Sequence, residues 1–385
     1  MVTTSYSQPR IAIIGGGPGG LILGRLLQYN QLGFTIFERE SSRSARQLQG
    51  GSLDIHAESG QEALRQAGLH DTFKLHMRVE GAALRVINKQ ADVLFSDEGR
   101  GEEDTRPEID RHVLRDILLD SIEPSSICWG KKVVKVEPVA DQANKFQISF
   151  ADGTTESGFD LVVGADGAWS NIRPFLTDIK PSHSGAIMVE GRIADVDTRY
   201  PEISKVVGHG SAFALGDRKG LLCQRNGDGS IRTYVLLIAQ ETWAKDCGID
   251  WVKEDAKDIL IEAEFGDWDQ RNKDLLLKAN EELIPRPLYM LPIGIKWESC
   301  PGVTLIGDAA HLMTPFAGVG VNLAMNDALD LANAIKSFVD DDQDAPLSEY
   351  QRKFEENMLE RARKFAQESW NNMKMMTGIA ASTFS

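Results

Sequence analysis

The sequence has few cysteines, no excess of positive charge and no long apolar run. Its four cysteines, Cys128, Cys223, Cys247 and Cys300, are scattered and none has CxxC spacing, so neither a zinc site nor a redox dithiol is indicated. Reduced thiols are typical of such cysteines in the cytosol. The formal charge is −15, from 42 basic and 57 acidic residues, which argues against a nucleic-acid or anionic-membrane partner.

The chain also lacks any stretch near the roughly 20 apolar residues that span a bilayer. Its longest apolar run, residues 235–239, has the length of a strand. Residues 1–10 are polar and lack the apolar centre of a secretory signal. We therefore expect a cytoplasmic protein with no membrane partner. Its 385 residues suffice for two domains.

The N-terminal part alternates strand and helix patterns. Residues 10–14 indicate a buried strand, residues 20–31 an amphipathic helix and residues 34–37 a second strand. A glycine turn separates the first strand from the helix. This order is typical of a βαβ unit with parallel strands.

The glycine turn has the spacing of a dinucleotide-binding loop. Gly15, Gly17 and Gly20 fit GxGxxG. In such a loop the first glycine permits the tight turn, the second lets the backbone approach a pyrophosphate, and the third lets the helix pack close to the strand. Glu38 ends the second strand, where a carboxylate accepts hydrogen bonds from an adenosine ribose. The motif alone does not separate NAD from FAD.

The middle of the chain has a different pattern. Residues 186–193, 211–215, 220–224 and 231–239 indicate strands, and residues 226–229 (NGDG) predict a hairpin turn between the last two. A β-rich insertion in an α/β chain indicates a second lobe built around a sheet.

Further helices are predicted on either side of this insertion. Residues 111–122 indicate a helix with Asp110 as its N-cap. Residues 323–336 and 347–376 indicate two C-terminal helices, and the acidic residues 340–344 between them predict a solvated linker.

Two more turns extend the glycine signal. Asp166-Gly167 follows the strand at 160–164, and Gly307-Asp308 follows another, with residues 315–322 close behind. Each alone indicates only a turn. Together with GxGxxG they resemble the three fingerprints of the class A, aromatic-hydroxylase type of FAD-dependent monooxygenase.

A closer resemblance covers most of the chain. Residues 50–56, 59–63, 107–111 and 265–269, with Leu114-Arg115, are similar to segments of TetX-type tetracycline-inactivating monooxygenases.

The resemblance implies an α/β fold. It would combine a Rossmann-type FAD-binding domain, a β-sheet substrate-binding domain and a long C-terminal bracing helix. The FAD-binding domain would be discontinuous, with residues 1–75, 102–178 and 289–338. The substrate-binding domain would comprise residues 76–101 and 179–288, and the C-terminal helix residues 346–376.

The resemblance also implies a set of cofactor-binding residues. Glu38 would bind the adenosine ribose with Arg39 beside the adenine, and Arg115 would neutralise the pyrophosphate. The helix that starts near Gly320 would aim its positive end at the flavin ring, where reduced flavin carries negative charge. The whole implied set is Gly15, Gly17, Gly20, Glu38, Arg39, Leu53, Asp54, Arg111, Arg115, Asp166, Asp308, Pro315, Gly318, Gly320, Val321 and Asn322.

Candidate substrate-binding residues come mainly from strand alternation. They are Met188, Glu190, Phe213, Leu215, Leu222, Pro315 and Phe316. Two positions depart from TetX-type enzymes, because Glu190 and Ala212 stand where those carry Gln and Arg for the polar edge of the tetracycline. Val319 departs from the wider family, which usually has Gln there. A phenolic or polyketide-like substrate therefore fits as well as a tetracycline.

The implied activity is monooxygenation with NADPH or NADH as transient reductant. Reduced flavin would add O2 to form a C4a-hydroperoxide that hydroxylates a phenolic, enolic or polyketide-like substrate; the cofactor supplies this chemistry. We assign no catalytic residue and no metal site, and we give His311 a structural role. Two alternatives stay open: a flavin-linked reductase or dehydrogenase, and a non-catalytic flavoprotein that sequesters a ligand. A monomer is expected.

Overall fold

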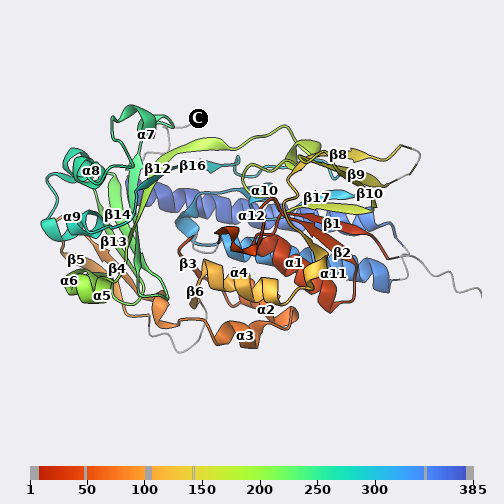
Figure 1. Ribbon diagram of the computed structural model, residues 1–385, viewed down its shortest axis with the longest axis horizontal. Coiled ribbons are helices and arrows are strands. Elements are labelled where there is room, and N and C mark those ends of the chain that lie inside the picture. The colour runs from red at the N-terminus through yellow and green to blue at the C-terminus, as the bar shows by residue number, and fades with distance from the viewer. Residues whose placement is uncertain are drawn as a thin grey trace, which may run out of the picture.

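The computed structural model describes most of the chain. The described residues are 8–46, 50–99, 106–140, 142, 144–341 and 345–378. Two bodies lie side by side in Figure 1, an α/β body on the right and a body built on a large sheet on the left, and α12 (Leu347–Thr377) runs between them. The two predicted lobes and the long C-terminal helix are therefore present.

The α/β body is built on a five-stranded parallel sheet in the order β17-β11-β1-β2-β7. The four residues of β1 are all buried, as expected for a strand covered on both faces. Its strands are β1 (Ile11–Ile14), β2 (Phe34–Phe37), β7 (Ile127–Cys128), β11 (Leu161–Gly164) and β17 (Val303–Leu305).

Helices cover one face of this sheet and a three-stranded meander covers the other. On β2, Ile36 lies against Gly24 of α1, whereas Phe37 packs on Phe150 of β9 with ring centroids 4.9 Å apart. The helices of this body are α1 (Pro18–Tyr29), α2 (Gly60–Gln66), α3 (His70–Lys74), α4 (Arg111–Asp120), α10 (Asp308–His311) and α11 (Gly320–Asp340). The meander is β8 (Val133–Pro138), β9 (Phe146–Phe150) and β10 (Thr155–Phe159), and a separate ribbon pairs β3 (Ser52–Asp54) with β6 (Glu108–Asp110).

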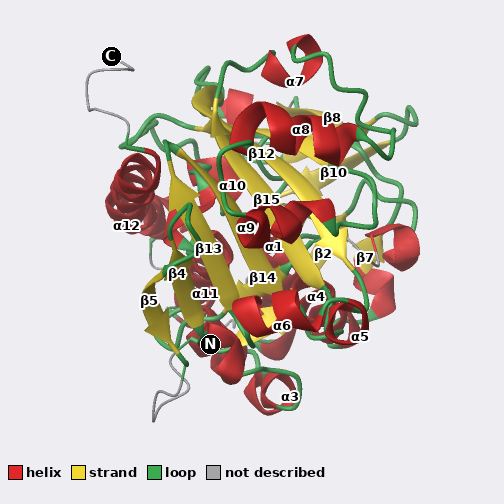
Figure 2. Cartoon of the chain, turned by 90° about the vertical axis from the view of Figure 1, so that its left-hand side faces the viewer, coloured by secondary structure: helices red, strands yellow, loops and turns green. Residues whose placement is uncertain are grey.

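The second body is a seven-stranded sheet in the order β16-β12-β15-β14-β13-β4-β5. Figure 2 looks onto the face that its helices cover. The strands are β4 (Leu84–Ile87), β5 (Val93–Asp97), β12 (Ser182–Ile193), β13 (Ser211–Gly216), β14 (Lys219–Arg225), β15 (Ile231–Ile238) and β16 (Ile284–Met290). The helices are α5 (Val196–Arg199), α6 (Pro201–Val207), α7 (Trp243–Asp246), α8 (Ala256–Phe265) and α9 (Gln270–Leu277).

The helix α12 touches both bodies. Near its start Glu355 accepts a hydrogen bond from Thr304 of β17 at 2.6 Å, and near its end Met373 packs with Leu222 and Leu236 of the large sheet. The predicted bracing role is confirmed by these contacts, because one rigid element is fixed at both ends to different sheets.

The predicted hairpin is confirmed, the predicted capping bond of Asp110 was wrong, and residues 342–344 of the predicted linker 340–344 lie outside the described residues, with Asp340 at the end of α11. The hairpin between β14 and β15 turns at residues 226–229 as predicted. Asp110 does stand at the N-cap of α4, but its side chain makes no capping bond. Its carboxylate accepts instead from the Gly227 amide (2.9 Å) and from Arg78 (2.8 Å), so tertiary contacts replaced the predicted cap.

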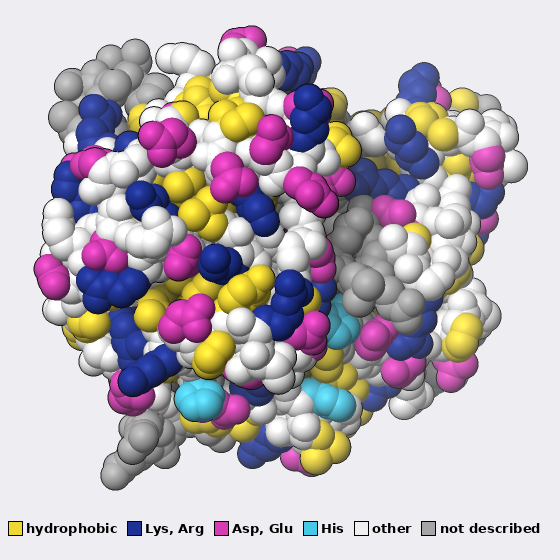
Figure 3. All heavy atoms as spheres, turned by 60° about the vertical axis from the view of Figure 1, so that its left-hand side comes forward, with side chains coloured by type: hydrophobic (Ala, Val, Ile, Leu, Met, Phe, Trp, Pro, Cys, Tyr) yellow, Lys and Arg dark blue, Asp and Glu magenta, His cyan; other side chains and the backbone are white. Residues whose placement is uncertain are grey.

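The surface and the helices give two general findings. Acidic and basic side chains are interspersed over the face in Figure 3. Across the described part of the chain, no helix is both long enough and apolar enough to cross a bilayer.

Candidate active site

A trough runs along the carboxyl edge of the parallel sheet. It consists of two adjoining cavities of about 300 Å³ and about 520 Å³, and Gly17, Ala165 and Gly167 line both. Ligands of open α/β sheets bind outside the carboxyl ends of the strands, so this is the position expected for a nucleotide.

The glycine turn shapes the middle of the trough. Gly15 has φ of +112°, which a side chain would strain. A Cβ on Gly20 would lie 2.0 Å from the Gly15 carbonyl oxygen, so only glycine lets α1 pack this closely. A Cβ on Gly17 would meet no described atom within 4 Å, which leaves its backbone open to a ligand. The three positions have the geometry that a pyrophosphate loop needs.

Two carboxylates lie in the smaller cavity. Glu38 is buried, and it accepts hydrogen bonds from the amides of Gly16 (2.5 Å) and Glu40 (2.9 Å). Burial raises the pKa of Asp166, whose Oδ2 accepts from the Asn171 amide at 2.7 Å. Its Oδ1 is buried without a hydrogen-bond partner among the described residues. An unpartnered buried oxygen beside the glycine turn suits a ligand that brings hydroxyl groups.

Two helices begin at the larger cavity. α1 starts at Pro18 and the 21-residue α11 starts at Gly320, and both residues line the cavity. Their free N–H groups and dipoles favour negative charge at this place. Asp308 is exposed to the same cavity. The trough therefore fits a dinucleotide whose phosphates meet α1 and whose ring meets α11.

Buried side chains fix the turn that carries Asp308. Arg173 donates to the carbonyl oxygens of Ala168 (2.8 Å), Asp308 (3.1 Å) and Ala309 (2.7 Å), and thereby ties the Asp166-Gly167 turn to the Gly307-Asp308 turn. Neither Arg173 nor these contacts were predicted from the sequence, because arginine in a loop gives no signal of its own.

Most of the implied cofactor-binding set meets in the trough, and three members do not line it. Gly20 is packed beneath Gly15. Asn322 is buried, where it bonds the backbone of Asp54 and His56. Arg115 donates to the carbonyl of Arg43 at 2.9 Å. Those that line it are Gly15, Gly17, Glu38, Arg39, Leu53, Asp54, Arg111, Asp166, Asp308, Pro315, Gly318, Gly320 and Val321.

The substrate-binding candidates divide in the same way. Met188 and Pro315 line the larger cavity. Glu190 is held by Arg232 (2.8 Å) and Arg286 (2.7 Å) instead. The other candidates pack in the small apolar cluster between the sheet and the end of α12; they are Phe213, Leu215, Leu222 and Phe316.

The expected position of Ala212 was wrong. Alignment with TetX-type enzymes put it at the polar edge of the substrate. In the structure Ala212 is fully buried on the opposite, helix-covered face of the large sheet. Its neighbour Phe213 faces the cavity side, because successive residues of a strand point to opposite faces.

Four polar residues that line the larger cavity were missed. They are Ser52 on β3, Gln224 on β14, Tyr234 on β15 and Thr314, which precedes Pro315. Alternation from Leu222 would have found Gln224, and Tyr234 pairs with Leu222 across the strands. Burial raises the pKa of Tyr234 to about 12, so its hydroxyl stays protonated.

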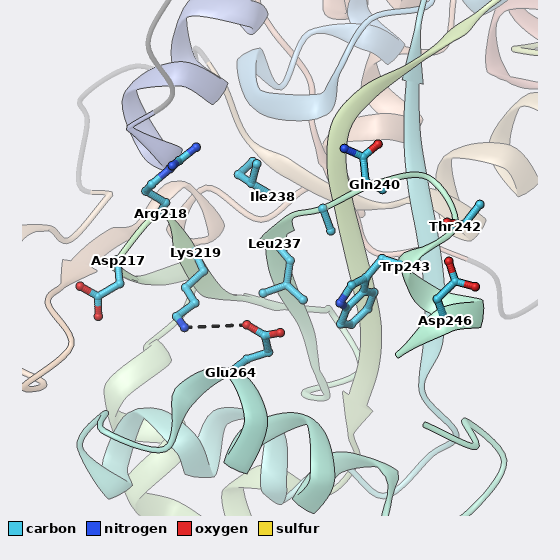
Figure 4. A pocket seen from close by; sticks show the side chains of 11 residues that line it. Asp217, Arg218, Lys219, Leu237, Ile238, Gln240, Thr242, Trp243, Asp246 and Glu264 are labelled. Atoms are coloured by element: carbon cyan, nitrogen blue, oxygen red, sulfur yellow. Dashed lines mark ion pairs between the residues drawn. The ribbon is translucent and has the colours of Figure 1, made fainter. Parts of the chain in front are cut away.

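A second hollow of about 580 Å³ lies in the large-sheet body (Figure 4). Its charged side chains have mixed signs, and Lys219 lies 3.8 Å from Glu264. Among the described residues it shares no lining residue with the trough. The trough, which contains the glycine turn and both carboxylates, is therefore the candidate active site.

Comparison with known proteins agrees with this geometry. Residues 9–267 and 299–365 match the FAD binding domain family. Monooxygenase asqM of Emericella nidulans is 34% identical over 85% of this chain and 84% of its own, and monooxygenase penA of Penicillium thymicola is 31% identical over 96% of both.

The chain belongs to the family of FAD-binding monooxygenases. This FAD-binding monooxygenase is thus an FAD-dependent oxidoreductase, and a reductant of the NAD(P)H type is typical of its family. The expected cofactor, FAD, is confirmed, and the trough has the shape and the donors to hold it.

Solved structures show the same fold. Klebsiella pneumoniae HpxO complexed with FAD and uric acid has a TM-score of 0.79 at 19% identity and covers 97% of this chain and 91% of its own. Tetracycline destructase Tet(51) has a TM-score of 0.67 at 20% identity, with 98% and 94% covered. At these identities the similarity concerns the fold alone.

Proposed function

We propose that this FAD-binding monooxygenase inserts one oxygen atom into an electron-rich phenol, enol or polyketide-like compound bound in the larger cavity. One observation carries the proposal. Asp308, Pro315 and Val321 line the cavity on the side of the glycine turn, and Met188 and Tyr234 line it from the large sheet. A flavin ring and a small organic molecule would therefore share one cavity.

We propose a division of roles along the trough. When bound, FAD supplies the electron transfer and the oxygen activation. Glu38 would hold the adenosine ribose, with Arg39 near the adenine, and the N-terminus of α11 would stabilise negative charge on the ring. Met188 and Pro315 would contact the apolar part of the substrate, and the chain would work as a monomer.

The cavity wall favours a substrate with hydroxyl or carbonyl groups. Gln224 and Tyr234 add polar groups to it, and Arg111 adds a cation. The Glu190 carboxylate already has two arginine partners, so it is not free to replace the glutamine of TetX-type enzymes in contacting a tetracycline. A smaller phenolic or enolic compound suits this wall better.

The test is a coupled assay on purified protein loaded with FAD. NADH and NADPH are each supplied with O2 and a panel of substituted phenols, enolised 1,3-diketones and tetracycline. The expected result is substrate-dependent NAD(P)H consumption with a product that is one oxygen heavier and labelled from 18O2. Turnover without oxygen incorporation would favour a reductase, and ligand binding without turnover would favour sequestration.

A further inference from the structure

The larger cavity holds a carboxylate that the roles proposed above leave unused. Among the described residues that line this cavity, the acids are Asp54 and Asp308. Asp308 begins α10, whereas Asp54 ends β3 and approaches the segment that leads into α11. A Cβ on Gly318 would lie 3.4 and 3.5 Å from the two carboxylate oxygens of Asp54. Asp54 therefore presents an acceptor to the part of the cavity where α11 begins.

A buried histidine holds this carboxylate from behind. The Nε2 atom of His56 lies 2.8 Å from Oδ2 of Asp54, and the His56 side chain is only 5% exposed. Because a carboxylate has no hydrogen to give, Nε2 carries the hydrogen of this bond. His56 is not among the described residues that line the cavity, so it acts on the cavity only through Asp54.

Asn322 fixes both residues relative to α11. It lies in the first turn of this helix, where its Nδ2 donates to the Asp54 carbonyl and its Oδ1 accepts from the His56 amide, both at 2.8 Å. Asn322 is buried, and a Cβ on Gly60 would lie 2.6 Å from its Oδ1, so the amide group is closely enclosed. The carboxylate of Asp54 is therefore held at the positive end of α11, where negative charge is favoured.

We propose that Asp54 accepts the proton of the substrate hydroxyl group, and that His56 and Asn322 position it. This rests on the proposed function, in which a phenol or enol, O2, NAD(P)H and one proton give the hydroxylated product, NAD(P)+ and water. The substrate O–H bond breaks and an O–H bond forms on Asp54 while the new C–O bond forms. Asp54 then returns the proton to the same oxygen of the product, so the overall balance is unchanged.

Loss of this proton makes the substrate more reactive. The electron pair of the broken O–H bond becomes available to the ring or double bond, which raises the electron density at the carbon that receives oxygen. A positioned base contributes typically about 10²–10⁴-fold to such a step, provided that it stays within hydrogen-bond reach of the hydroxyl group. The bonds from His56 and Asn322 keep the Asp54 carboxylate in one place for this purpose.

Other charges surround the pair, and they set the background for any pH dependence. No charged residue occurs between 315 and 326, which covers the segment before α11 and its first turns. The charged groups on the remaining neighbours are Glu58 beside His56, Arg65 of α2 at the Ala57 carbonyl, Glu108 opposite Asp54 on β6, and Arg111 and Asp308 at the cavity wall. All of them stay in place when only Asp54 is changed.

The chain offers matched variants. D54N keeps the size of the side chain and an oxygen that accepts from His56, but its amide cannot take a proton. E58Q is the control for the lost charge, because Glu58 lies 3.9 Å from Nδ1 of His56, is 70% exposed and is not among the described residues that line the cavity. H70Q is the control for H56Q, because His70 of the nearby α3 pairs with Gln61 instead.

The experiment measures kcat and KM against pH for FAD-loaded protein, with the panel compound that the wild type oxygenates. D54N should be about 10²-fold slower at neutral pH and should recover as the substrate ionises in solution, because an ionised hydroxyl group needs no base. H56Q should lower kcat about tenfold with little change in KM, whereas E58Q and H70Q should match the wild type. A wild-type rate in D54N, or no alkaline recovery, would overturn the proposal.

A bound nitrophenol gives a readout independent of turnover, because only its ionised form absorbs strongly in the visible. It is titrated by difference absorbance on FAD-loaded protein without NAD(P)H. A neighbouring carboxylate opposes ionisation of the phenol, so the bound nitrophenol should ionise about one pH unit higher in the wild type and E58Q than in D54N. Equal titrations, or no binding to the wild type, would overturn the proposal. Absence of oxygenated product, with the titrations differing as expected, would contradict the proposed function and leave the assignment of Asp54 supported.

Discussion

The Nε2 atom of His311 lies 2.6 Å from an oxygen of Asp327, and both side chains are buried behind the Gly307-Asp308 turn. The same oxygen of Asp327 accepts from the Gly307 amide at 3.0 Å, and its other oxygen accepts from Arg361 of α12 at 2.9 Å. One carboxylate therefore joins a turn of the active site, a histidine and the bracing helix.

Replacing Asp327 should strongly destabilise the protein. D327N leaves the buried His311 and the half-buried Arg361 beside a neutral group, and breaking a buried ion pair costs about 3–5 kcal/mol. The free energy of unfolding in urea measures the effect. The control is D330N, because Asp330 is a partly exposed partner of the same arginine and its loss should cost about 1 kcal/mol or less. Equal losses in the two variants would contradict the assignment.

The stability that His311 contributes should depend on pH. Burial by itself would lower the pKa of His311, but the charge and hydrogen bond of Asp327 outweigh it and raise the pKa above 6.5. The contribution is then fully present below pH 6.5 and is lost as the pH rises through the raised value. Thermal melts should show the largest gap between wild type and H311Q on the acidic side.

The contribution of His70 to stability should have the opposite pH dependence. Burial is the largest cause that lowers its pKa, so protonation opposes folding there. The wild type should lose stability relative to H70Q as the pH falls through the lowered pKa. Parallel pH dependence in H311Q and H70Q would be inconsistent with both assignments.

The close packing at Gly20 should be essential for FAD. In G20A the new Cβ would meet the Gly15 carbonyl at 2.0 Å, so the glycine turn must move, at a cost of about 1–3 kcal/mol or more. We expect much less bound flavin, measured as the absorbance ratio at 450 and 280 nm after gel filtration. G33A is the control, since no described atom lies within 4 Å of its Cβ position. Full flavin content in G20A would refute the role of the turn.

Arg173 should determine how firmly the two acidic turns are held. A lysine keeps the charge but has one nitrogen in place of a planar fork, so it cannot bond three separate carbonyl oxygens in the same geometry. R173K should lose about 1–3 kcal/mol of stability and bind FAD at least tenfold more weakly, measured by flavin fluorescence quenching. R363K, at an exposed arginine paired with Glu360, should match the wild type.

Predictions that depend on residues close together in the sequence were confirmed, whereas features that depend on contacts between distant segments were missed. The glycine turn depends on residues within one turn of the chain, so Gly15, Gly17 and Gly20 could be located and their geometry foreseen. The expected position of the Ala212 side chain was wrong because a shift of one residue in a strand exchanges the two faces of a sheet. Ser52 lies in the segment 50–56 that resembles TetX-type enzymes but was not named as a site residue, because it joins the cavity wall only where β3 comes beside residues of a sheet distant in sequence.

The sequence by itself determined that the chain begins with a parallel βαβ unit, contains a β-rich insertion, ends in long helices and binds FAD. Local periodicity and glycine spacing suffice for these elements and for a dinucleotide-binding loop, whereas FAD as the cofactor came from the family resemblance carried by the Asp166-Gly167 and Gly307-Asp308 turns. Only the tertiary structure decided which side chains share the trough of Gly15, Gly17 and Glu38. Side chains from distant segments reach it only after the two sheets and α12 have packed, so its far wall, with Gln224 and Tyr234, could not be predicted from neighbouring residues.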